Sequence, residues 1–118
     1  MTATPPIALD PIAERELEYR DTLDAPVRKA VIRIGRPRHV PPPPGEEDVT
    51  ADYWVCPYEI TIEEGNVRSS HAYGADSIQA LQLAISKIGV ELRHLFPGHF
   101  TMDGNSEIGF PVTDDGVT

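Results

Sequence analysis

The chain has 118 residues, of which 40% are hydrophobic, and this composition suits one domain with a modest core. The net charge of −9 argues against non-specific nucleic-acid binding, which needs a basic surface. The single cysteine excludes an internal disulfide. No stretch reaches transmembrane length and the N-terminus lacks the pattern of a signal peptide, so we expect a cytoplasmic protein without membrane contact.

The first third of the chain predicts a lead-in and two strands. Residues 1–11 contain three prolines and little periodicity, which indicates a flexible lead-in. Residues 12–20 fit either a helical turn or a strand, and the alternation of Leu17 and Tyr19 with charged residues favours a strand. Residues 27–36 alternate more clearly, with Ala30, Ile32 and Ile34 on one face, and predict a second strand.

Residues 37–52 predict a proline-rich, acidic loop. Its four consecutive prolines, residues 41–44, must be extended in the manner of polyproline II. The run is typical of a stiff surface connection, and a ligand for a proline-binding domain is the alternative. Glu46, Glu47 and Asp48 follow as an acidic tip.

Residues 53–64 predict the longest strand. Trp54, Cys56 and Tyr58 share one face with two isoleucines, and Tyr53 lies on the other face. Pro57 lacks an N–H donor, so the strand must be an edge or carry a bulge there. Residues 65 and 66 form a short turn, and residues 67–73 pair back as a hairpin.

Residues 76–96 predict the one long helix. Asp76 is a suitable N-cap, and Gln79 follows at the spacing of a capping box. An apolar stripe recurs at spacings of three and four residues and predicts the buried face: Ile78, Leu81, Ile85, Ile88, Leu92 and Leu95. Helical geometry is disfavoured before Pro97, so the helix ends there.

The remaining residues predict a closing segment and a tail. Phe100 and Met102 precede a turn signal at residues 103 and 104, and Ile108 and Phe110 follow it, so a small hairpin or folded loop should pack on the core. We expect a single α+β domain over residues 12–111, followed by a flexible acidic tail, residues 112–118. Its antiparallel sheet has about four strands, and the helix covers one face.

Three stretches together resemble a family of small bacterial proteins known only as a domain of unknown function: residues 13–38, the W-x-C-P-Y strand at residues 54–58, and the Y-G-x-D-S-x-Q-A-L-x-L-A helix start at residues 73–84. Residues 104–111 fit the same pattern. The resemblance implies a bacterial, intracellular, single-domain protein, and it carries no activity, cofactor or catalytic residue. Some small α+β proteins are immunity proteins that block a toxin, which is an analogy of fold only.

Enzymatic and metal sites have plain structural alternatives. Cys56 with His71 as its base would form a nucleophilic pair, but unpaired cysteines are usually small buried hydrophobes. His94 and His99 are too few and too separated to predict a metal site. We therefore assign no catalytic residue, metal or cofactor.

Binding residues are better candidates. Arg36 and Arg38 could hold a phosphate or a carboxylate, or could pair with the chain's own acids. Tyr53 is the aromatic residue expected on the open sheet face.

We expect a non-enzymatic binding or regulatory module for a basic protein, using these residues and Glu46, Glu47 and Asp48. An anion sensor using Arg36 and Arg38 is the alternative, and a small enzyme is a further one. Self-association through an exposed strand edge is a corollary.

Overall fold

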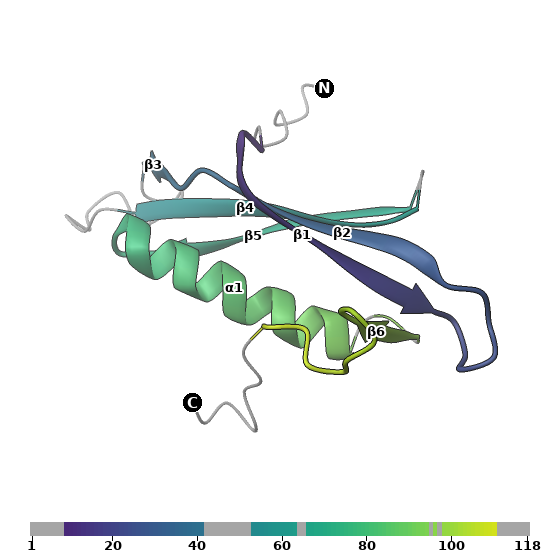
Figure 1. Cartoon of the computed structure of the whole chain (residues 1–118). Helices are drawn as coiled ribbons and strands as arrows, with labels where there is room; N and C mark the ends of the chain where they lie inside the picture. The colour runs from purple at the N-terminus through teal and green to yellow at the C-terminus, as the bar shows by residue number, and fades with distance from the viewer. Residues whose placement is uncertain (1–8, 42–52, 64–65, 95, 97, 111–118) are drawn as a thin grey trace.

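The computed structural model describes residues 9–41, 53–63, 66–94, 96 and 98–110. In this part of the chain, six strands form one antiparallel sheet with one helix against it (Figure 1). The elements in chain order are β1 (Pro11–Arg20), β2 (Arg28–Gly35), β3 (Arg38–Val40), β4 (Tyr53–Ile62), β5 (Val67–Gly74), α1 (Ser77–His94) and β6 (His99–Thr101). The predicted α+β class is confirmed, and two short strands, β3 and β6, account for the larger strand count.

The strand β4 lies inside the sheet and has partner strands on both sides. Its residue Ile60 lies opposite Ile32 of β2 on one side and opposite Arg68 of β5 on the other. The order across the sheet is therefore β6, β1, β2, β4 and β5, and β3 continues along the same edge of β4 as β2. Residues 12–20, which fitted a helix or a strand, form β1 and extend it to Pro11.

Pro57 lies where the pairing of β4 changes from β2 to β3. Tyr58 is the last β4 residue opposite β2, and Val55 is the first opposite β3. The ladder is interrupted between them, where a residue without an N–H costs no ladder hydrogen bond. Of the two predicted alternatives for Pro57, the structure contains the irregularity rather than an edge strand.

The prediction of a loop over residues 37–52 is wrong at its start, because Arg38–Val40 form β3. Pro37 ends the pairing of β2, and the chain then resumes an extended course along β4. A three-residue strand after a proline has no periodicity of its own, so only the partner strand reveals it.

The two faces of the sheet differ in chemistry. The inner face and the helix form one apolar cluster, of which the fully or almost fully buried sheet members are Leu17, Tyr19, Ala30, Ile32, Ile34, Cys56, Tyr58, Ile60, Ile62 and Ala72. The outer face carries cross-strand ion pairs, including Arg33 with Glu14 at 2.9 Å and Lys29 with Glu16 at 3.4 Å. Beside these ion pairs the sheet has the period-2 pattern of an antiparallel sheet with one face in water, whereas Val55 of β4 is buried on the same outer face.

The helix α1 begins with the predicted capping box. The N–H of Gln79 donates to Oδ1 of Asp76 at 2.7 Å, and Oε1 of Gln79 accepts from the N–H of Ala75 at 2.6 Å. The first bond satisfies a backbone donor that the first helical turn leaves unpaired, and the second satisfies the N–H of the residue before the N-cap.

The face that α1 buries is rotated from the predicted stripe. Ala80, Ala84 and Ile88 are fully buried, whereas Ile78 is 66% exposed. The physical reason is the size of the alanines, which let the helix approach β5 closely at Gly74, where an added Cβ would collide with the backbone of Ala80. Glu91, which the predicted stripe left out, is buried as well.

Residues 98–110, called the closing segment below, complete the inner face. In Figure 1 they lie beside the C-terminal end of α1, and β6 pairs antiparallel with β1. Met102 and Asn105 exchange two backbone hydrogen bonds around Asp103 and Gly104, whose φ angles of 51° and 83° suit a tight hairpin turn. The predicted small hairpin is therefore confirmed. The pairing of β6 with β1 was not predicted from the sequence.

Within the described residues, α1 is not long and apolar enough to cross a membrane.

Candidate functional site

Cys56 and His71 do not form a nucleophilic pair. In the β4–β5 register Cys56 lies opposite Ala72 and His71 lies opposite Pro57, so the two residues occupy opposite faces of the sheet. The Cys56 side chain is fully buried, its Sγ lies 3.5 Å from the carbonyl oxygen of Gly35, and burial raises the pKa of the thiol to about 11. A nucleophilic cysteine needs the reverse, a lowered pKa and access.

The histidines near the end of α1 are not gathered into a metal site. Both His94 and His99 are exposed. Among the residues that the structure describes, no group of three or more His, Cys, Asp or Glu side chains could hold a metal ion.

The two candidate arginines have different surroundings. Nε of Arg36 lies 2.9 Å from Oδ2 of Asp10, so the chain already supplies its carboxylate. Arg38, on β3, makes no ion pair or side-chain hydrogen bond with the described part of the chain. An anion site that uses both guanidinium groups would have to share Arg36 with the Asp10 carboxylate.

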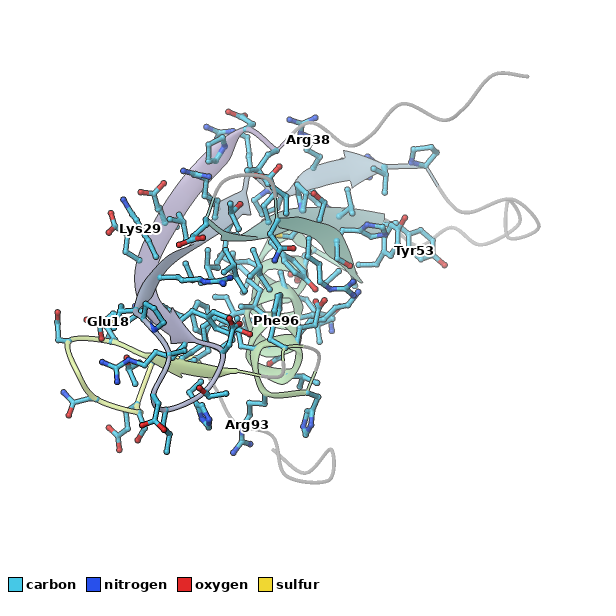
Figure 2. All side chains as sticks on the ribbon, turned by 90° about the vertical axis from the view of Figure 1, so that its right-hand side faces the viewer. Glu18, Lys29, Arg38, Tyr53, Arg93 and Phe96 are labelled. Carbon is cyan, nitrogen blue, oxygen red and sulfur yellow. The ribbon has the colours of Figure 1, made fainter. Side chains whose placement is uncertain are left out.

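The structure brings Arg38 and Tyr53 to one corner of the outer face. Arg38 lies opposite Val55, which lies opposite Tyr73, and Val40 lies opposite Tyr53. Figure 2 shows Arg38 and Tyr53 on the part of the sheet that lies away from β6. We call Arg38, Val40, Tyr53 and Tyr73 the tyrosine patch.

Tyr73 is the most exposed aromatic residue of this patch. Its side chain is 51% exposed, and its ring packs edge-on against His71 at a centroid distance of 5.0 Å. Partial burial, and secondarily the charge of Lys87, lower the pKa of His71. Both effects favour the neutral form of the ring beside Tyr73.

The predicted acidic residues Glu46, Glu47 and Asp48 lie outside the described residues, so the structure gives no account of them. The predicted core aromatics behave as expected, because Tyr58 is fully buried and Trp54 packs against the core cluster.

Two cavities lie between α1, the sheet and the closing segment. The larger, about 460 Å³, is bounded by the C-terminal half of α1 and the closing segment. The smaller, about 230 Å³, is bounded by β1, β2 and Ile85. Gly109 and Phe110 line both cavities, so the end of the closing segment separates them.

Arg15 fastens that separating segment to β1. Its Nη1 donates to the carbonyl oxygen of Ile108 at 3.1 Å, and its guanidinium carbon lies 5.2 Å from the centre of the Phe110 ring. A side chain at Gly109 would collide with the same guanidinium group. One arginine thus contacts three consecutive residues of the closing segment.

The edge strand β5 is held by the helix beneath it. Nζ of Lys87 donates to the His71 carbonyl oxygen at 2.9 Å and to Ser70 Oγ at 3.1 Å. A lysine placed along an edge strand also disfavours pairing with another chain.

The comparisons with known proteins identify a family, and the description of that family names no activity. The family described as Domain of unknown function (DUF6968) matches residues 13–112. The chain belongs to this family. A search of curated proteins found no match, and a search of solved structures found none either.

Sequence reasoning missed two polar features of this DUF6968 chain. Arg68 of β5 contacts the buried Glu91 of α1 through Nε and Oε1, and burial raises the pKa of the Glu91 carboxyl. Arg93 and Glu107 both line the larger cavity. The signal for Glu91 was available, since it recurs at helical spacing with Ala80, Ala84 and Ile88, but a carboxylate is usually placed in water.

Proposed function

We propose that this DUF6968 domain is a non-enzymatic module that binds a basic protein through its tyrosine patch. The observation that carries the proposal is the register, which sets two tyrosines and an arginine without a partner in the described chain on one corner of the outer face. Tyrosine and arginine are enriched in the residues that dominate binding energy at interfaces.

The net charge supports a basic partner. The net charge of −9 raises the local concentration of a basic protein and speeds its association at low ionic strength. Arginine and lysine side chains of such a partner would lie over the exposed ring of Tyr73 and the half-buried ring of Tyr53. Arg38 would pair with a carboxylate or backbone carbonyl of the partner beside them.

The experiment is a capture from native lysate at low and moderate salt with three baits. They are the unaltered chain, the double variant Tyr53→Ala/Tyr73→Ala, and the control Leu23→Ala, whose side chain is 70% exposed between β1 and β2. We expect a basic protein on the first and third baits, weakened by salt, and its loss from the double variant.

Two results would remove the proposal. One is a partner that the double variant retains at full occupancy. The other is a lysate from which none of the baits recovers a stoichiometric protein. Circular dichroism of the double variant separates lost binding from lost folding.

The alternative of an anion sensor is not favoured by the geometry, because Asp10 already occupies Arg36. The bacterial origin and cytoplasmic location expected from the sequence fit a protein partner in the same cell, and they belong to this proposal. Self-association through β5 is opposed by Lys87.

A further inference from the structure

The larger cavity has the size and lining of a small-molecule site. Its volume of about 460 Å³ lies within the range of about 300–1,000 Å³ that is typical of ligand sites. Its apolar lining comes from two separate elements, α1 and the closing segment, and includes Leu92, Phe100, Ile108 and Phe110. This lining would take the apolar body of a ligand.

The same cavity has one cation and one anion among its lining residues. Arg93 belongs to the last turn of α1, and Figure 2 shows it on the side of the helix away from the sheet. Glu107 belongs to the closing segment. In the described part of the chain the two residues form no ion pair with each other or with any other side chain.

We propose that this cavity binds a zwitterion with a large apolar side chain, that is, a free hydrophobic α-amino acid. Arg93 pairs with the carboxylate and Glu107 pairs with the ammonium group. The side chain enters between Leu92 and Ile108 and meets the rings of Phe100 and Phe110. This inference is independent of the proposed protein partner, because the tyrosine patch lies on the other face of the sheet.

The pair of charges selects the zwitterion over simpler amphiphiles. A fatty acid would bring its carboxylate beside Glu107, and an alkyl amine would bring its cation beside Arg93, so each meets a like charge. A charge-assisted hydrogen bond strengthens binding by about tenfold or more. Glycine carries both charges but fills none of the apolar lining.

The test is a thermal shift and calorimetric titration of the full chain with millimolar L-phenylalanine, L-leucine, 3-phenylpropionate, phenethylamine and glycine. We expect the first two to raise the midpoint of unfolding, because a ligand that binds only the native state stabilises it. The carboxylate alone and the amine alone should bind about tenfold more weakly. Glycine should give no shift.

Two exposed substitutions complete the test without disturbing the core. Arg93→Gln and Glu107→Gln should each weaken binding of L-phenylalanine by about tenfold. Arg38→Gln, on the far side of the molecule, is the matched control and should leave it unchanged. The proposal is overturned by the absence of any shift with both hydrophobic amino acids, by equal binding of 3-phenylpropionate, or by unchanged affinity in both variants.

Discussion

The two halves of the inner sheet face are covered by different means. The helix covers β4 and β5 through small residues, with Ala80 and Ala84 fully buried and Gly74 in contact with the helix backbone. The closing segment covers β1 and β2 through short irregular backbone, and cavities of about 460 and 230 Å³ remain beside it. Close packing makes the first half intolerant of change in volume. The second half has room to take up a ligand.

The largest expected contrast comes from truncating one isoleucine in each half. Ile88 is fully buried, so Ile88→Ala should lower the free energy of unfolding by about 2–5 kcal/mol. Ile108 is only partly buried and already borders a cavity, so Ile108→Ala should cost about 1 kcal/mol. Chemical denaturation measures both. Equal losses would show that the two halves are packed alike.

The next effect is overpacking at the contact between helix and sheet. Gly74→Ala places a Cβ against the backbone of Ala80, which cannot move aside as a side chain can. We expect a loss of about 1–3 kcal/mol in the free energy of unfolding. Thermal denaturation gives the measurement, and a variant as stable as the parent would mean that α1 can shift on β5.

A smaller loss should follow from releasing the closing segment. Arg15→Met keeps the aliphatic stem but removes the hydrogen bond to Ile108 and the charge over Phe110. We expect the free energy of local opening to fall by about 1 kcal/mol, which would be seen as faster amide exchange over residues 105–110. The control Arg33→Met breaks an exposed ion pair on the outer face and should leave that exchange unchanged.

Acid should loosen the same half through Glu18. Its Oε1 accepts hydrogen bonds from Oγ1 of Thr101 at 2.7 Å and from the N–H of Gly104 at 3.1 Å, and these bonds lower the pKa of the carboxyl. A carboxyl with a lowered pKa in the folded state stabilises the fold above its unfolded pKa, and that contribution disappears as pH falls through the folded pKa.

The measurement is amide exchange of residues 99–102 below and above pH 4.5, corrected for the intrinsic pH dependence of exchange. We expect protection to fall on acidification in the parent chain. Glu18→Gln should make the protection of these residues independent of pH in this window. If the variant keeps the pH dependence of the parent chain, another group causes that dependence.

The smallest expected effect concerns β5, the edge strand of the half that the helix covers. Lys87→Ala removes the donor to the His71 carbonyl and the charge along β5, so self-association should strengthen by a few-fold. Sedimentation at several concentrations measures it. If the variant associates no more than the parent chain, then Lys87 does not protect this edge.

The sequence was sufficient for local elements and insufficient for what distant segments do to one another. Alternation predicted β1, β2 and β4, and the residues Asp76 and Gln79 predicted the start of α1, because these signals act within a few residues. The strand β3 is visible only through its pairing with β4. His71 and Cys56 lie on opposite faces of the sheet because of the hairpin register, which local sequence patterns do not determine.

The candidate sites follow the same division. Tyr53 was placed on the correct face by alternation alone, but its nearness to Arg38 required the pairing of β3 with β4. The apolar period of α1 predicted that Ile78 would be buried and did not select Ala80. Such a period reports the hydrophobicity of side chains and not how closely the helix approaches the sheet. The cavity lined by Arg93 and Glu107 arises from two segments that meet only after folding, so no local sequence motif predicts it.

Pro57 also acts as a marker of strand alignment. A shift of β4 by one residue would place the nitrogen of Pro57, which has no N–H, opposite a backbone carbonyl that needs a hydrogen-bond donor. It would also turn the side chain of Tyr58 toward water. The correct alignment is therefore encoded within β4 itself rather than in the length of the chain that leads to it. Insertions or deletions in residues 42–52 should therefore leave the sheet in the same alignment.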